Sequence, residues 1–156
     1  MDKFDNMLAK YQPVALSLFR FITGLLLFQY GVAKILKFPM IPEGNAYAFL
    51  SKVQLMSLSG AAGLIELIFG ALLLIGLFTR FAAFILAGEM AVAYFKSHAP
   101  RAFFPILNRG ELAALFCFVF LYFAAAGGGS WSLDALLRRR RPVVASPQPA
   151  ARSPPS

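Results

Sequence analysis

The chain has 156 residues, of which 59% are hydrophobic, and it carries a formal net charge of +8. A soluble domain has roughly 45–50% apolar residues, so this composition argues against an ordinary soluble protein and indicates a membrane protein. The chain contains one cysteine and one histidine. A disulfide, a dithiol redox pair, a His-rich metal site and two-histidine haem ligation are therefore excluded within one chain.

Four apolar segments are predicted to cross a bilayer, which takes about 20 mainly apolar residues per helix. They are residues 14–33, 58–78, 81–95 and 112–126. The last two are short, and we expect them to extend to His98 and back to Asn108. The first carries Arg20 and lacks a small-residue cleavage site, so we expect it to be retained and not removed as a signal peptide. The predicted fold is all-α, a bundle of four transmembrane helices over residues 14–134.

The segments around these spans are predicted to be short and mostly irregular. Residues 1–13 form a cytoplasmic lead, ended by Pro13 in the first turn of the first helix. The longer loop after the first span includes residues 46–56, which we expect to form a helix on the membrane interface. A tight turn is expected at 76–80. Residues 135–156 are basic and rich in Pro, Ala and Ser, so we expect a disordered tail.

The arginine run at 138–141 predicts the orientation of the chain. Four spans place both termini on one side of the membrane, and cytoplasmic segments carry the excess of Lys and Arg. Both termini are therefore predicted to be cytoplasmic. We interpret the run as an anchor on anionic lipid and do not expect a nucleic-acid partner.

Three charged residues lie inside the predicted spans: Arg20, Glu66 and Glu89. An ionised group in hydrocarbon costs several kcal/mol unless it is paired or hydrated, so each marks a contact inside the bundle. The predicted depths allow all three to meet near the midplane, with Arg20 within ion-pair reach of Glu89 or Glu66 and at least one carboxyl, for which Glu66 is the candidate, without a cation. Two interpretations remain open. The residues form a structural ion-pair network, or they line a polar pocket for a proton, a quinone head group or another small amphiphile.

A second polar group is expected at the outer surface. It consists of Lys34, His98, Asn108 and Glu111, which lie at the ends of the predicted helices. One interpretation is that they are interfacial anchors and a helix cap, and Glu111 in the first turn suits the helix dipole. The other is that they form the polar mouth of the inner pocket.

Several spaced motifs give the chain a family resemblance over about residues 14–134. The motifs are Arg20-x-x-x-Gly24, Gly31-x-x-Lys34, Glu66-Leu-Ile-Phe-Gly70, Gly76-Leu-Phe-Thr-Arg80, Ala93-Tyr-Phe-Lys-Ser-His98, Phe103-Phe-Pro105-x-x-Asn108-x-Gly-Glu111 and Gly129-Ser-Trp-Ser-Leu-Asp134. In this order and spacing they resemble the DoxX family of small four-helix bacterial membrane proteins. One position departs from the pattern: Tyr30 stands where the family often has a histidine.

The resemblance implies a redox-linked role, because some relatives are subunits of a thiosulfate:quinone oxidoreductase and others are associated with quinone or thiol stress. We therefore expect an accessory or subunit of a redox system in the bacterial inner membrane. Its partners would be the lipid bilayer and a redox protein, with quinone as the candidate ligand and no intrinsic cofactor or metal. A transporter for protons or small solutes and a structural scaffold are the alternatives. The lack of internal repeats counts against transport, and the lack of Cys and His pairs counts against catalysis by the chain alone.

Overall fold

The computed structural model describes residues 2–140, and these residues form helices, turns and loops without a β-strand. The four long helices are α1 (Asp2–Ile35), α2 (Leu58–Ile75), α3 (Thr79–Ala93) and α5 (Glu111–Ala126). The shorter elements are the 3₁₀ helix η1 (Ala48–Lys52), the π-helical segment η2 (Tyr94–His98), α4 (Pro105–Asn108) and α6 (Leu133–Arg139). The all-α class predicted from the sequence is confirmed.

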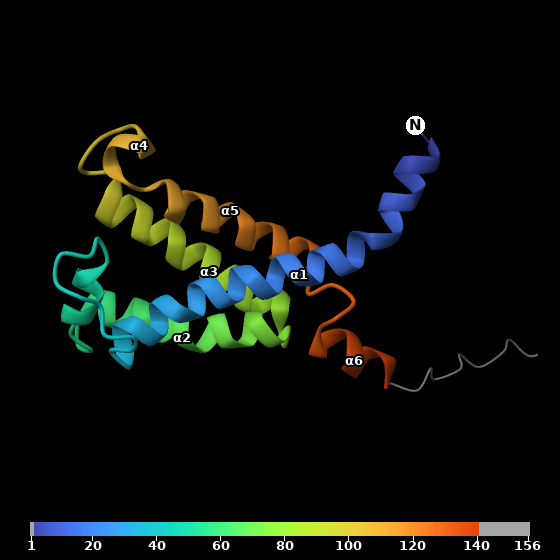
Figure 1. Cartoon of the computed structure of the whole chain (residues 1–156), viewed down its shortest axis with the longest axis horizontal. Coiled ribbons are helices and arrows are strands. Elements are labelled where there is room, and N and C mark those ends of the chain that lie inside the picture. Colours follow the sequence, from blue (N-terminus) through green and yellow to red (C-terminus); the bar gives the residue numbers. More distant parts are fainter. Residues whose placement is uncertain (1, 141–156) are drawn as a thin grey trace, which may run out of the picture.

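The long helices pack as two pairs, α1 on α2 and α3 on α5, and α2 also contacts α3 (Figure 1). The buried core draws on all four. Its members are Leu27, Leu73, Ala83, Leu86, Ala87, Met90, Phe116, Phe120 and Phe123. The start of α1 and helix α6 lie at the same end of the molecule, opposite the loops that follow α1 and η2 (Figure 1).

Helices α1 and α2 approach each other closely at glycines. A Cβ atom added to Gly31 would lie 2.6 Å from the Cα of Leu67, and one added to Gly24 would lie 2.8 Å from the backbone nitrogen of Leu74. Either distance is too short for a real contact. Small residues at helix contacts let backbones approach in membrane proteins, where packing has to replace the hydrophobic effect. The glycines thus allow the backbones of α1 and α2 to lie in contact.

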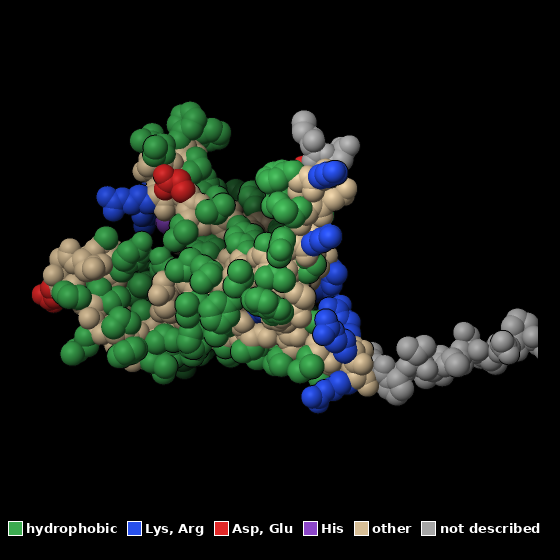
Figure 2. Space-filling view, turned by 45° about the vertical axis from the view of Figure 1, so that its right-hand side comes forward, with side chains coloured by type: hydrophobic (Ala, Val, Ile, Leu, Met, Phe, Trp, Pro, Cys, Tyr) green, Lys and Arg blue, Asp and Glu red, His purple; other side chains and the backbone are tan. Residues whose placement is uncertain are grey.

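The outer surface is largely apolar. The segments Lys3–Ile35 and Leu58–Ile75 are long and apolar enough to cross a membrane, whereas Glu111–Ala126 is apolar but shorter. Large side chains such as Phe84 and Phe118 are 64% and 70% exposed. Figure 2 shows this apolar surface running over the body of the molecule, with Lys and Arg gathered at its edges. An apolar surface of this extent is suited to lipid and not to water.

Two predicted extensions have different outcomes. The 15 residues of α3 and the five of η2 form one helical run, about 30 Å at 1.5 Å per residue, so the predicted extension to His98 is confirmed. The extension of the fourth span back to Asn108 is wrong as a continuous helix. Arg109, with φ 58°, and Gly110 separate α4 from α5.

Three other local predictions are corrected. Helix α1 begins at Asp2 and includes Pro13; it bends in its first part (Figure 1) instead of starting after the proline. A proline inside a helix removes one backbone hydrogen bond and bends the helix without having to end it. The interfacial helix expected at 46–56 is only the 3₁₀ helix η1. Helix α6 occupies the start of the predicted tail, and the rest of that tail lies outside the described residues.

The α1–α2 contact makes a prediction about two glycines. Gly31→Ala should reduce the free energy of unfolding by about 1–3 kcal/mol, because the added methyl group collides with the α2 backbone. The measurement is reversible unfolding in detergent, followed by circular dichroism. Gly88→Ala is the matched control, since a Cβ at Gly88 meets nothing within 4 Å. It should be neutral or stabilise by up to about 1 kcal/mol. Equal effects of the two changes would contradict the prediction.

Candidate functional site

Arg20 is buried at the end of the molecule where α2 stops. Its Nη1 atom donates hydrogen bonds to the carbonyl of Leu73 and, at 2.6 Å, to that of Leu74. Its Nε and Nη2 atoms donate to the carbonyls of Gly128 at 2.9 Å and Trp131 at 2.8 Å. The last carbonyls of a helix lack intrahelical donors, so Arg20 supplies them for α2 and joins α1 to the segment after α5.

The predicted pairing of Arg20 with Glu66 or Glu89 is therefore wrong. The guanidinium binds carbonyls seven and eight residues beyond Glu66, about 10 Å further along α2. Four carbonyl acceptors at the end of two helical segments can satisfy most of the guanidinium donors without a carboxylate. The structure thus gives Arg20 a structural role at the end of α2, away from Glu66 and Glu89.

Other charged side chains at this end also cap helices. Asp134 accepts hydrogen bonds from the backbone nitrogens of Phe78 and Thr79, both at 2.8 Å, at the start of α3. Arg80 donates to the carbonyls of Ala124, at 3.0 Å, and Ala125 near the end of α5. An anion at a helix N-terminus and cations at C-termini match the helix dipoles. Asp134 was recognised in the sequence only as part of a motif, because its partners are more than 50 residues away.

At the opposite end of α1, Lys34 forms an ion pair with Glu66. Their Nζ and Oε1 atoms are 2.7 Å apart, and the side chains are 13% and 4% exposed. Gly63, one turn before Glu66 on α2, leaves room for the Lys34 side chain: a Cβ there would lie 2.9 Å from the Cβ of Lys34. Lys34 was expected at the outer mouth and Glu66 deeper, so the structure unites residues from the two predicted groups. Glu66 also has a cation, contrary to prediction.

Glu89 of α3 completes what we call the carboxylate cluster, which consists of Lys34, Glu66 and Glu89. Glu89 is partly buried and lies close enough to both other members for their charges to act on it, but no hydrogen bond or ion pair found in the described residues joins it to either. The cluster has one cation for two carboxyl groups. Within the described part of the chain, the Oε2 atoms of Glu66 and Glu89 are buried and have no hydrogen-bond partner. A buried acceptor without a donor costs about 1–3 kcal/mol, so the cluster favours a proton or a ligand that donates hydrogen bonds.

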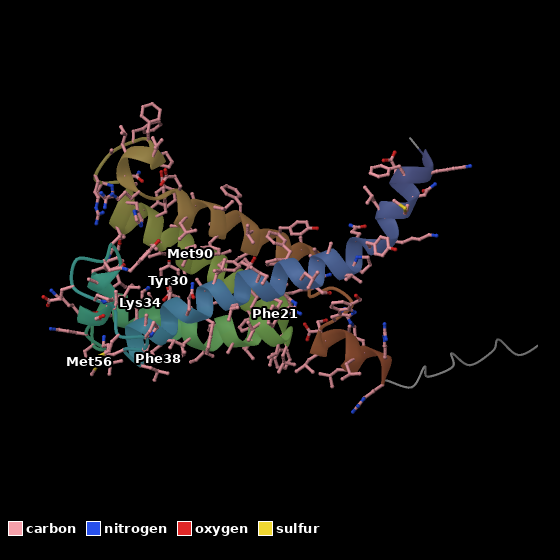
Figure 3. The ribbon with its side chains drawn as sticks, viewed as in Figure 1. Phe21, Tyr30, Lys34, Phe38, Met56 and Met90 are labelled. Atoms are coloured by element: carbon pink, nitrogen blue, oxygen red, sulfur yellow. The ribbon has the colours of Figure 1, made fainter. Side chains whose placement is uncertain are left out.

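Tyr30 lies one turn before Lys34 on α1, at the same end of the bundle (Figure 3). Its ring meets that of Tyr47 edge-on, with centroids 5.9 Å apart. In the sequence, Tyr30 stood out only as the position where the DoxX family often has a histidine. Its spacing of four residues from Lys34 is the signal that places both on one helix face.

The remaining predicted outer residues form a separate arrangement. The Nδ1 atom of His98 lies 3.0 Å from the carbonyl oxygen of Asn108. Asn108 is buried; its Nδ2 atom donates to the carbonyl of Ala102 and its Oδ1 atom accepts from Gly110 nitrogen. Glu111 is exposed at the start of α5. Asn108 thus holds the loop between η2 and α5 together, and Glu111 joins neither group through a hydrogen bond or ion pair found in the structure.

Comparison with known proteins identifies the family. The DoxX family model matches residues 15–99, more than half of the chain. The chain belongs to the DoxX family. The matched DoxX region includes α1 from residue 15 onward, all of α2 and α3, and the whole carboxylate cluster, and the membrane character of the chain agrees with this family. In residues 2–140, no group of three or more His, Cys, Asp or Glu side chains is placed to hold a metal ion.

Two relatives come from Haemophilus influenzae. One is 43% identical over 132 residues, covering 83% of this chain and 95% of the relative; it is described as an uncharacterized protein. The other, also described as uncharacterized, is 34% identical over 78 residues, covering 50% of this chain and 52% of the relative. No solved structure matches. The descriptions of these relatives name no activity.

The ion pair predicts a specific pattern of stability. Lys34→Met should reduce the free energy of unfolding by about 3 kcal/mol, because it leaves Glu66 buried without its cation. Adding Glu66→Leu to the same chain should recover most of this loss. A double-mutant cycle of unfolding in detergent measures the coupling, with the exposed Lys52→Met as the control. Additive effects of the two substitutions would show that the pair does not act as a unit.

Proposed function

We propose that this DoxX protein is an accessory or subunit of a quinone- or thiol-linked redox system in the bacterial inner membrane, and that the carboxylate cluster binds a quinone-type head group. The observation that carries the proposal is the pair of buried carboxylate oxygens without donors beside a partly buried lysine. Charged groups inside an apolar helical protein are costly and commonly mark a ligand or proton site.

The cluster has the chemistry that such a head group needs. The hydroxyl groups of a quinol would donate hydrogen bonds to the free oxygens of Glu66 and Glu89, and the Lys34 ammonium would donate to a quinone carbonyl. The carboxylates would take up the protons that a quinol releases when it is oxidised, while the two electrons pass to a partner protein. This chain would then bind and orient the ligand and accept protons.

Quinone content tests this proposal. The full chain is purified in mild detergent, and extracted quinones are quantified by mass spectrometry per mole of protein, alongside binding of a short-chain ubiquinol by calorimetry. Glu89→Gln should lower quinone content and quinol affinity about ten-fold, because it removes a charged acceptor. Glu111→Gln is the control: it removes an exposed carboxylate outside the cluster and should change neither value.

The alternatives give other results. Wild-type protein that neither carries quinone nor binds quinol would overturn the proposal. Proton or solute flux into vesicles, without quinone binding, would favour the transporter alternative. Neither binding nor flux would leave the cluster as a structural ion-pair network. Equal quinone loss in both variants would show that the ligand lies elsewhere.

The second part of the proposal is a multi-pass topology with both termini in the cytoplasm. Its support is the arrangement of the described ends: the beginning of α1 and helix α6 lie at one end of the molecule, together with the exposed Arg138, Arg139 and Arg140. Segments rich in Lys and Arg stay in the cytoplasm.

Reporter fusions test this topology. A fusion after residue 140 should read as cytoplasmic, and one in the loop at residues 40–46 should read as periplasmic. Neutral replacements of Arg138, Arg139 and Arg140 should reduce the cytoplasmic signal of the first fusion, because they remove the largest concentration of positive charge. Neutral replacement of Arg101 and Arg109, in the opposite loop, is the control and should not. A periplasmic reading after residue 140 in the intact protein would reverse the orientation.

A further inference from the structure

An open groove of about 310 Å³ lies between the end of α2 and helix α6, at the end of the molecule away from the carboxylate cluster. Its lining includes Ile75, Ser130, Trp131, Leu133, Leu136 and Arg139. The groove thus combines a mainly apolar lining with one arginine. The proposed quinone site does not use it.

The apolar side of the groove is continuous with the outer face of α2. Ile75 is 46% exposed, and Ile68, two turns earlier on the same face, is 55% exposed. On the α6 side, Trp131 is 63% and Leu136 is 45% exposed. Tryptophan is enriched at the boundary between lipid tails and head groups. The groove therefore lies where the apolar outer face of α2 meets the charged end of the molecule.

The rim of the groove is positively charged. Arg138, Arg139 and Arg140 are exposed on and after α6, and Arg139 itself lines the groove. Figure 2 shows Lys and Arg gathered along the right-hand end of the molecule. The nearby carboxylate of Asp134 already accepts two backbone hydrogen bonds. The charge at this rim is thus complementary to an anion.

The groove is also held in a fixed shape. Arg20 donates to the carbonyl of Trp131, and the backbone nitrogen of Trp131 donates to the Ser17 hydroxyl at 3.0 Å. The backbone nitrogen of Asp134 donates to the carbonyl of Gly76 at 2.9 Å. These bonds join the segment before α6 to α1 and to the α2–α3 turn. A preorganised site loses less conformational entropy when it binds.

We propose that this groove binds an anionic phospholipid from the adjacent leaflet. The phosphate lies at Arg139 with its neighbouring arginines, and an acyl chain runs along Ile75 toward Ile68. A phospholipid fits because its charged head and apolar chain match the two sides of the groove in the same order. A soluble anion would leave the exposed Trp131 and Leu136 without an apolar partner.

Trp131 is the single tryptophan of the chain, so its fluorescence reports on this groove directly. The full-length protein in detergent is titrated with brominated phosphatidylglycerol or brominated phosphatidylcholine, whose bromine atoms quench nearby tryptophan. Phosphatidylglycerol should quench saturably and at a several-fold lower concentration. Equal midpoints for the two lipids, or no quenching by either, would overturn the proposal. A change of Trp131 fluorescence with protein concentration in the absence of brominated lipid would assign the groove to a second copy of the chain and also overturn it.

Two variants locate the lipid head group. Arg139→Gln should raise the phosphatidylglycerol midpoint about five-fold, since one cation near an anionic surface is worth about 1 kcal/mol, and should leave the phosphatidylcholine midpoint unchanged. Arg101→Gln removes an exposed arginine from the loop after η2 and should have no effect. Arg139 is exposed, and an unchanged circular dichroism spectrum verifies the fold. Equal shifts of the phosphatidylglycerol midpoint in both variants would show that only the net charge of the protein matters, and would overturn the site.

Discussion

The close approach of α1 and α2 is the constraint on which the rest of the structure depends. Gly24 and Gly31 bring α1 against the backbone of α2, and Gly63 makes room for Lys34 from the other side. Because both helices are long and nearly rigid, contact along their length fixes what meets at each end. At one end Lys34 reaches Glu66, and at the other Arg20 reaches the last carbonyls of α2. A wider spacing would separate both sets of groups.

The two ends use charge in different ways. Around Arg20, the charged side chains of Arg20, Arg80 and Asp134 hydrogen-bond to backbone groups near helix ends, although the hydroxyl oxygens of Thr79 and Ser130 at this end are buried without a partner. In the carboxylate cluster, two acids share one lysine and two buried oxygens lack donors. A polar network in which the charged groups have hydrogen-bond partners stabilises a fold. A ligand or a proton gains the most binding free energy where buried charged groups lack such partners. This contrast is the reason to look for function at Glu66 and Glu89, and for structure at Arg20.

Membership of the DoxX family and the apolar outer surface place this chemistry in a membrane protein. In that setting the partly buried cluster and the groove beside α6 face different surroundings. The cluster draws one residue from each of α1, α2 and α3, and its partly buried position suits proton exchange. The groove opens beside the lipid-facing side of α2 at a basic rim, which suits a phospholipid. A redox accessory of this kind would bind its ligand and its membrane at opposite ends.

Composition and local pattern were sufficient for the helical class, the positions of the long helices, the turn after α2 and the end of α5 at Gly127, because apolar runs and glycines act over short distances in the chain. They also identified most of the polar residues that matter.

Composition and local pattern did not determine which of these residues meet. Depth counted along separate helices placed Arg20 beside the glutamates, but a long side chain shifts its charge by several ångströms, and the carbonyls of α2 and of the segment after α5 compete for it. The Lys34–Glu66 ion pair joins residues 32 positions apart, and the contact of α6 with the α2–α3 turn joins residues still further apart. The lack of a partner for the Oε2 atom of Glu89 likewise depends on how the helices pack. Only the packing of the helices decides such contacts, because the sequence carries no local signal for them.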